Sequence, residues 1–187
     1  MRIITGKAKG VKLTTLEGDN TRPTAERVKE AVFSMIQFDI EGRRVLDLFS
    51  GSGQMALEAI SRGADSAVLV DRSKDAVAVI KSNVKKARLE DACTIYQGDY
   101  LDFIRRYRGE AFDVVFLDPP YALKMYRPAL SALLENGLLK NSSLIICESG
   151  EDEVFEGDTA LAEHFEIEKQ SRYSKTYITI FKIKGRD

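Results

Sequence analysis

Residues 45–56 read Val-Leu-Asp-Leu-Phe-Ser-Gly-Ser-Gly-Gln-Met-Ala, a short apolar run that leads into two closely spaced glycines and then into helix-forming residues. The apolar run predicts a buried strand. Gly51 and Gly53 predict a tight turn, because glycine adopts backbone angles that other residues avoid. A strand, a glycine turn and a helix start in this order are typical of α/β proteins that bind a nucleotide above the turn. This stretch therefore decides the fold class.

From residue 43 onward the chain alternates between short apolar runs and longer amphipathic stretches. The former predict strands at 45–49, 66–71, 93–97, 112–117 and 144–148, and the latter predict helices at 54–61, 74–88, 100–107 and 126–134. This alternation predicts a doubly wound, Rossmann-like α/β fold, whose sheet is mostly parallel with helices on both faces. Two final runs, 165–172 and 175–184, alternate apolar and polar residues and predict an antiparallel pair that completes the sheet.

The first forty residues do not follow this alternation. Residues 2–14 place apolar runs on either side of a Gly- and Lys-rich turn and predict a short hairpin. The apolar spacing after Pro23 predicts a helix over 24–38. We therefore expect an N-terminal hairpin-helix extension at residues 1–41, followed by one α/β domain at residues 42–187.

Composition excludes several classes of protein. Of the 187 residues 44% are hydrophobic and 30% charged, and the formal net charge is −1. No apolar stretch could span a bilayer and the N-terminus has no apolar signal core, so we expect a cytoplasmic protein without a membrane partner. The single histidine, His164, and the distant Cys93 and Cys147 predict no metal site, no Ser-His nucleophile and two reduced, buried thiols. Nothing in the sequence demands more than a monomer.

Three acidic residues stand at the ends of three successive predicted strands: Asp47, Asp71 and Asp99. Asp71 follows Gly51 by 20 residues, a spacing at which a carboxylate accepts both hydroxyls of a ribose. Asp99 could meet an adenine amino group. Taken alone, Asp71 or Asp99 is better explained as a helix N-cap. Together, the three acids fit one nucleoside ligand in the crevice above the strand ends.

The tetrapeptide Asp118-Pro119-Pro120-Tyr121 follows the fourth predicted strand. Prolines fix the backbone and lack an N–H, so the loop offers the Asp118 carboxylate and the Pro119 carbonyl as acceptors. Two acceptors could hold both N–H groups of an exocyclic amine and leave its lone pair free to attack a methyl group. Tyr121 could stack on the base, a contact worth about 1–3 kcal/mol. The plain alternative is a turn that the prolines stiffen.

The glycine turn and the Asp-Pro-Pro-Tyr loop resemble those of class I, S-adenosylmethionine-dependent amino-methyltransferases. More narrowly, the chain resembles the RsmD family, bacterial methyltransferases that act on the guanine N2 amino group of small-subunit (16S) ribosomal RNA. This resemblance is carried by Arg-Ile-Ile-x-Gly at residues 2–6, Lys-Leu at 12–13, Arg-Pro-Thr at 22–24, Arg-Val-Lys-Glu at 27–30, Leu-Glu-Ala-x-Ser-Arg-Gly-Ala at 57–64 and Arg-Tyr-x-x-Thr at 172–176. One departure is Gln54-Met55, where the family more often carries small or aliphatic residues. We expect it to alter the packing of the pocket.

The resemblance implies methyl transfer from S-adenosylmethionine to guanine N2 in ribosomal RNA or a small-subunit particle, with no metal and no covalent enzyme intermediate. The catalytic candidates are Asp118, Pro119, Pro120 and Tyr121. The cofactor-binding candidates are Asp47, Phe49, Gly51, Ser52, Gly53, Asp71, Arg72, Asp99, Tyr100 and Asp118. The RNA-binding candidates are Arg22, Thr24, Arg27, Lys7, Lys9 and Lys12, together with Lys29. For each of these Lys and Arg residues taken singly, a role as a solvated surface charge stays open.

Three other functions compete with this one. A DNA adenine-N6 methyltransferase would share the chemistry, but such enzymes usually carry a separate target-recognition domain. An NAD-dependent oxidoreductase would explain Gly51-x-Gly53-x-x-Ala56 and Asp71, but would leave Asp-Pro-Pro-Tyr unexplained. A non-catalytic RNA-binding module could use the basic N-terminus and would not need the nucleoside pocket.

Overall fold

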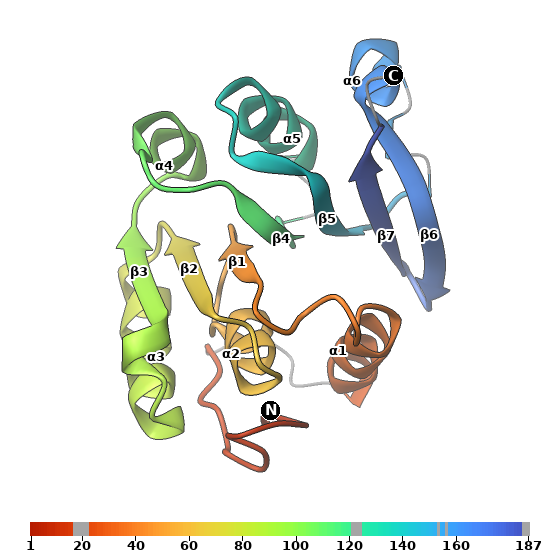
Figure 1. Ribbon diagram of the computed structural model, residues 1–187. Coiled ribbons are helices and arrows are strands. Elements are labelled where there is room, and N and C mark those ends of the chain that lie inside the picture. The colour runs from red at the N-terminus through yellow and green to blue at the C-terminus, as the bar shows by residue number, and fades with distance from the viewer. Residues whose placement is uncertain (17–22, 121–124, 153, 156, 185–187) are drawn as a thin grey trace.

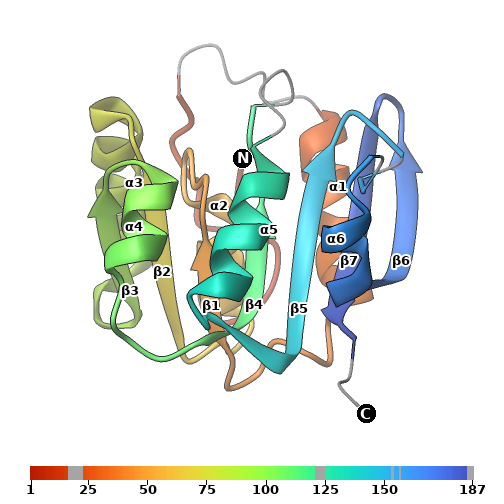
Figure 2. The same ribbon diagram turned by 90° about the horizontal axis from the view of Figure 1, so that it is seen from above.

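The structure is a computed structural model that describes residues 1–16, 23–120, 125–152, 154–155 and 157–184. One seven-stranded sheet has the order β3-β2-β1-β4-β5-β7-β6 (Figure 1). The strands are β1 (Arg44–Asp47), β2 (Ser66–Asp71), β3 (Cys93–Gln97), β4 (Phe112–Leu117), β5 (Leu139–Ser149), β6 (Phe165–Tyr173) and β7 (Thr176–Ile183). The first five pair in parallel, and β7 is antiparallel to both of its neighbours, with its arrow opposite to that of β5 in Figure 2. The predicted fold class is confirmed.

Helices cover both faces of the sheet, as Figure 1 shows. On one face lie α1 (Pro23–Met35), α2 (Gln54–Ser61) and α3 (Lys74–Ala87), and on the other lie α4 (Tyr100–Arg106), α5 (Tyr126–Glu135) and α6 (Thr159–His164). Each face has its own apolar core. The central strands read as continuous apolar runs because both of their faces are buried, and every residue of β4 is buried.

The strand order places the direction change of the sheet between β1 and β4. From β1 the chain builds outward to β2 and β3, and it then crosses back to add β4 and β5 on the other side. The loops that follow β1 and β4 therefore diverge at the carboxyl edge and leave room for a ligand. The glycine turn and the Asp-Pro-Pro segment are the beginnings of these two loops.

Several details differ from the sequence-based expectation. Strand β5 begins five residues earlier than predicted, and α1 ends at Met35 instead of residue 38. The short helix α6 and a 3₁₀ turn at Glu90–Ala92 were not predicted, because each spans barely a turn or two and carries too little periodicity. Cys147 is buried as expected, whereas Cys93 is only half-buried, and both are free thiols. Within the described residues no helix is long and apolar enough to cross a membrane.

The N-terminal hairpin is present in reduced form. A single antiparallel bridge joins Arg2 to Lys12, and the Ile3 amide donates to the Val11 carbonyl at 3.0 Å. The inner side chains of the hairpin, Ile3, Ala8 and Leu13, belong to the same apolar core as α1 and α2. The division of the chain at residue 41 stays a prediction.

Lys29 corrects one expectation about RNA contacts. Its side chain is 1% exposed, so it cannot reach a phosphate on the surface. The Lys29 Nζ donates to the Arg2 carbonyl at 2.6 Å and lies 3.4 Å from the Glu58 carboxylate. Burial lowers the pKa of Lys29, and the neighbouring Glu58 opposes this shift. Lys29 therefore has a structural role, because it connects α1 to α2 and to the hairpin.

The change Lys29→Met tests this internal role. The variant leaves the Arg2 carbonyl without its donor and removes one cation from the fully buried Glu58, so we expect the free energy of unfolding to fall by about 3 kcal/mol. The exposed Lys85 of α3 provides the control, and Lys85→Met is expected to change stability by less than about 0.5 kcal/mol. Urea denaturation measures both. Equal stability of the two variants would contradict the buried tie.

Candidate active site

The turn between β1 and α2 is a left-handed backbone segment held by its own hydrogen bonds. Gly51 and Gly53 have φ values of 53° and 77°. The Ser50 hydroxyl donates to the Asp47 carbonyl at 2.7 Å, and the Ser50 amide donates to the Val70 carbonyl at 3.0 Å. A Cβ at Gly53 would also lie 3.0 Å from a Leu69 methyl, which is tighter than normal packing allows. Both glycines are therefore required by the backbone path.

Asp47 lies beneath this turn. Its side chain is 3% exposed, and one carboxylate oxygen accepts from the Ala56 amide in the first turn of α2 at 3.4 Å. Burial raises the pKa of Asp47 to about 7, and the nearby charge of Asp71 adds to that shift. The carboxyl group thus accepts a hydrogen bond from the first turn of α2 and stabilises the start of that helix.

A cavity of about 530 Å³ lies at the carboxyl edge of the sheet, a volume in the range of small-molecule sites. Its described lining comes from the N-terminal segment, the turn after β1, the ends of β2, β3, β4 and β5, and the residue before α5. The lining residues are Met1, Thr15, Leu16, Leu48, Phe49, Ser50, Gly51, Ser52, Gln54, Asp71, Arg72, Gly98, Asp99, Tyr100, Asp118, Pro119, Pro120, Met125 and Glu148.

The structure brings most of the predicted site residues together in this cavity. The cofactor candidates that line it are Phe49, Gly51, Ser52, Asp71, Arg72, Asp99, Tyr100 and Asp118, and the catalytic candidates that line it are Asp118, Pro119 and Pro120. Asp47 and Gly53 are not part of its lining, because they lie under the turn. Tyr121 falls outside the described residues.

Asp71 and Asp99 are each fixed by backbone amides. One Asp71 oxygen accepts from the Gly51 amide at 2.9 Å, and the other accepts from the Ser73 amide at 2.8 Å. Asp99 caps α4 through one oxygen, which accepts from the Leu101 amide at 2.8 Å. A carboxylate oxygen has two lone pairs, so these bonds orient the groups and leave acceptor capacity toward the cavity.

Apolar and aromatic side chains form another part of the wall. The rings of Phe49 and Tyr100 lie with their centroids 5.0 Å apart, tilted by 47°. Burial raises the pKa of the Tyr100 hydroxyl, and the Asp99 charge adds to this. Together with Leu48 these rings offer an apolar surface next to the Asp71 and Asp99 carboxylates, which suits a nucleoside with a flat base and a polar sugar.

The charge of the described lining selects against an anionic ligand. Four carboxylates line the cavity, Asp71, Asp99, Asp118 and Glu148, against one cationic side chain, Arg72. In dinucleotide-binding proteins the pyrophosphate occupies the start of the helix after the glycine turn. Here the Asp47 carboxylate already accepts from that part of α2. The cavity therefore favours a ligand with positive charge.

Gln54 carries a buried acceptor without a partner. Among the described side chains, Gln54 Oε1 is one of two buried polar atoms that have no hydrogen-bond partner, and Gln54 lines the cavity. A ligand N–H or O–H would satisfy this oxygen. Gln54 is the residue at which the sequence departs from the resembled family, and its place in the wall agrees with an effect on the pocket.

The predicted RNA-binding residues lie elsewhere. Lys7, Lys9 and Lys12 are exposed on the hairpin and Arg27 is exposed on α1. Thr24 belongs to the first turn of α1, but its side chain is not described, and Arg22 falls outside the described residues. Within the described part of the chain, no group of three or more His, Cys, Asp or Glu residues is arranged to hold a metal ion.

Sequence reasoning missed several lining residues. Glu148 continues the row of strand-end acids on β5, so the periodic placement of acids could have identified it. Met1, Thr15 and Leu16 carry no motif that points to a cavity, because their position depends on how the hairpin packs.

Comparison with known proteins identifies the family of the chain. A family model described as "Conserved hypothetical protein 95" matches residues 1–182. A ribosomal RNA small subunit methyltransferase D of Haemophilus influenzae is 38% identical over 81% of this chain and 80% of its own. The chain belongs to the ribosomal RNA small subunit methyltransferase D family. A putative rRNA methyltransferase of Bacillus subtilis, YlbH, is 34% identical over 99% of this chain and all of its own.

The solved structure of the putative methyltransferase yhhF from Escherichia coli shares the fold, with a TM-score of 0.85 at 24% identity over 100% of this chain and 99% of its own. Membership of the methyltransferase D family confirms the resemblance that the sequence motifs carry. It removes the support for an oxidoreductase and for a non-catalytic RNA-binding module.

The raised pKa of Asp47 predicts a pH-dependent stability. Because burial raises the pKa of Asp47 in the folded chain to about 7, from an ordinary value of 3.8, the folded chain resists ionisation of Asp47, and stability falls as the pH rises from about 4 to 7. Asp47→Asn keeps an acceptor for the Ala56 amide without the charge. We expect the variant to gain stability over the wild type between pH 5 and pH 8, by an amount on the order of a few kcal/mol.

Thermal unfolding at several pH values measures this gain, with the exposed Asp65→Asn as the control. A stability difference between Asp47→Asn and wild type that stayed constant from pH 5 to pH 8 would contradict the assigned shift.

Proposed function

We propose that the protein transfers a methyl group from S-adenosylmethionine to the exocyclic N2 amino group of a guanine in small-subunit (16S) ribosomal RNA. The observation that carries this proposal is the acid-lined cavity bounded by Asp118-Pro119, in a chain of the methyltransferase D family. Ribosomal RNA or a small-subunit particle as the substrate, the monomeric state and the cytoplasmic location belong to the same proposal.

The cavity residues fit S-adenosylmethionine, which when bound supplies an electrophilic methyl group on a positively charged sulfur. Asp71 would accept from the ribose hydroxyls, and Asp99 would accept from the adenine amine. Phe49 and Tyr100 would contact the apolar surface of the base. Carboxylates that outnumber cations in the lining favour the cationic donor, because opposite charges attract strongly where water is excluded.

Asp118 and Pro119 would hold the acceptor amine. Asp118 lies directly after β4 and lines the cavity, while the adjacent Pro119 is buried. The carboxylate and the Pro119 carbonyl can accept the two amine N–H groups, so the nitrogen lone pair would point at the methyl carbon at about 3–3.5 Å. Both acceptors stabilise the positive charge that develops on nitrogen. The methylated amine then loses a proton to Asp118 or to water.

The guanine must be unpaired or flipped out of a helix, because N2 lies against the partner base in a duplex. We propose Tyr121 as the stacking partner of this base. Arg22, Thr24, Arg27, Lys7, Lys9 and Lys12 are the proposed contacts to the RNA backbone. The four of these that the structure shows as exposed, Arg27 and the three hairpin lysines, are free to reach phosphates.

Transfer of labelled methyl groups tests the proposed function. The protein is incubated with radiolabelled S-adenosylmethionine and small-subunit particles from cells that lack it, and the RNA is then digested to nucleosides. We expect the label in N2-methylguanosine. Label in another nucleoside of RNA or DNA would refute the target base, and no transfer despite cofactor binding would refute a nucleic-acid substrate.

Asp118→Ala separates the role of the amine acceptor from that of cofactor binding. We expect turnover to fall by at least about 10³-fold, because the variant loses an interaction that orients and stabilises the reacting amine. S-adenosylmethionine affinity, measured by calorimetry, is expected to fall far less than turnover, because Asp71, Asp99 and Glu148 keep the lining acidic. The exposed Asp102→Ala is the control. Loss of cofactor binding together with turnover would contradict this assignment.

A further inference from the structure

The N-terminal segment reaches the cavity although it lies outside the α/β alternation. Met1 at one end of the segment and Thr15 and Leu16 at the other line the same cavity as the strand-end acids. Figure 2 marks the N-terminus level with the edge of the sheet to which β5 points, and Figure 1 places it beyond α2, on the face that α1, α2 and α3 cover. Residues 1–16 therefore contribute to the same cavity as the glycine turn, and something must hold them there.

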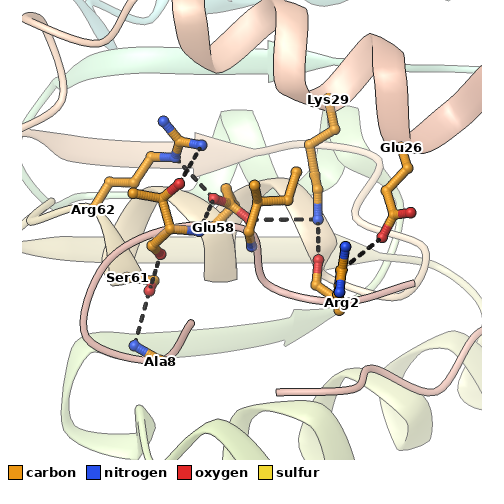
Figure 3. Close-up of polar contacts among 9 residues, drawn as sticks. Arg2, Ala8, Glu26, Lys29, Glu58, Ser61 and Arg62 are labelled. Carbon is orange, nitrogen blue, oxygen red and sulfur yellow. Dashed lines mark hydrogen bonds and ion pairs between the residues drawn. The ribbon is translucent and has the colours of Figure 1, made fainter. Parts of the chain in front are cut away.

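Glu58 of α2 provides the first attachment, shown in Figure 3. Its fully buried carboxylate accepts from the Ile4 amide at 2.8 Å and the Thr5 amide at 3.1 Å, so both oxygens bind the hairpin backbone. Arg62 donates to the same carboxylate at 2.8 Å, and Lys29 lies 3.4 Å away. These cations balance the buried charge, which would otherwise be strongly unfavourable.

Ser61 continues the attachment one turn further along α2. Its hydroxyl donates to the Thr5 carbonyl at 2.6 Å and accepts from the Ala8 amide at 2.9 Å, while its carbonyl accepts from the Lys7 amide at 2.8 Å. The Arg-Ile-Ile-x-Gly and Leu-Glu-Ala-x-Ser-Arg-Gly-Ala stretches of the sequence analysis are therefore bound to each other. The proposed reaction itself leaves both stretches unexplained.

Asn83 of α3 provides the second attachment. This fully buried side chain accepts from the Thr14 amide at 2.8 Å and donates to the Thr14 carbonyl at 2.8 Å and to the Ser52 carbonyl at 2.9 Å. One amide group thus joins the segment that precedes Thr15 to the glycine turn. Both partners lead directly into the cavity wall, so Asn83 sets the separation between two sides of the site.

We propose that residues 1–16 form a wall of the methyl-donor site, and that Glu58 and Asn83 are positioning residues that hold this wall in place. The inference rests on the proposed function, since it takes the ligand of the cavity to be S-adenosylmethionine. A wall formed by a docked segment contributes to donor affinity only while it is docked. Undocking therefore weakens donor binding without touching the amine acceptors at Asp118 and Pro119.

Two glycines of the hairpin offer a matched test of docking. Gly6 and Gly10 have nearly the same left-handed φ, +87° and +86°. A Cβ at Gly6 would lie 1.7 Å from the Ser61 carbonyl oxygen, whereas a Cβ at Gly10 has no atom within 4 Å. Alanine at either position strains the backbone alike, but only alanine at Gly6 forces the hairpin away from α2. Neither residue lines the cavity.

The experiment compares Gly6→Ala, Gly10→Ala and wild type. Calorimetry gives the Kd for S-adenosylmethionine, and hydrogen exchange of the residue 4–8 amides reports docking. We expect Gly6→Ala to lose amide protection and to raise Kd by at least about tenfold, with kcat at saturating donor nearly unchanged. Gly10→Ala is expected to keep protection and affinity. A general loss of stability would affect both variants. It would not raise the KM for the donor in Gly6→Ala alone while leaving kcat nearly unchanged.

Asn83→Asp provides an independent second variant. It keeps the acceptor for the Thr14 amide but replaces the donor to Thr14 and Ser52 with an oxygen, so we expect a raised Kd as well. Its control is Lys86→Ala, which removes only the exposed contact to the Thr14 hydroxyl.

If Gly6→Ala lost amide protection but bound the donor as tightly as wild type, the proposal that residues 1–16 form a wall of the donor site would be wrong. Protected amides in Gly6→Ala would overturn the docking contact itself. Absence of donor binding in the wild type would instead refute the proposed function.

Discussion

Helix α2 is only eight residues long, and the site depends on the hydrogen-bond partners of its first-turn amides and of its buried Glu58 carboxylate. At its first turn a buried Asp47 and a left-handed Gly53 replace an ordinary side-chain cap. In its second half the buried Glu58 needs donors, and the hairpin backbone and two cations supply them. Because one rigid helix meets both demands, the glycine turn at one end and the N-terminal segment at the other hold fixed positions around the same cavity.

Asp99 combines a structural role with a place in the cavity wall. It caps α4 and lines the cavity, since a carboxylate oxygen that accepts from a helix amide keeps further lone pairs. Capping also fixes the side chain before any ligand arrives. A capping residue at the carboxyl edge of a parallel sheet is thus a pre-oriented acceptor, and the same bonds that stabilise the helix reduce the entropy lost on binding.

The sequence predicted the parts of the site that local pattern determines. Strands such as β4 are recognisable as apolar runs, and the acids Asp71, Asp99 and Asp118 follow such runs directly, so their common edge follows from parallel topology. Positions that depend on tertiary packing could not be found in this way. Lys29 and Arg27 stand two positions apart in one basic helix, yet the first is buried against Glu58 and the second is exposed, because α1 turns one face to the core.

The distribution of charge reconciles two ligands of opposite sign on a chain whose net charge is only −1. The cavity lining holds four carboxylates and one cationic side chain, while the outer surface of the hairpin carries Lys7, Lys9 and Lys12. Interactions between exposed charges are largely screened beyond about 8 Å at physiological salt, so each surface acts on its own ligand. Under the proposed function, the cationic donor would be attracted to the cavity and the polyanionic RNA to the outer face of the hairpin. The N-terminal segment contributes to both surfaces, since Met1, Thr15 and Leu16 face the cavity and the lysines face solvent. A segment with these two faces must be fixed to the helices beneath it, and hydrogen bonds between its backbone and the buried Glu58 and Asn83 side chains fix it there.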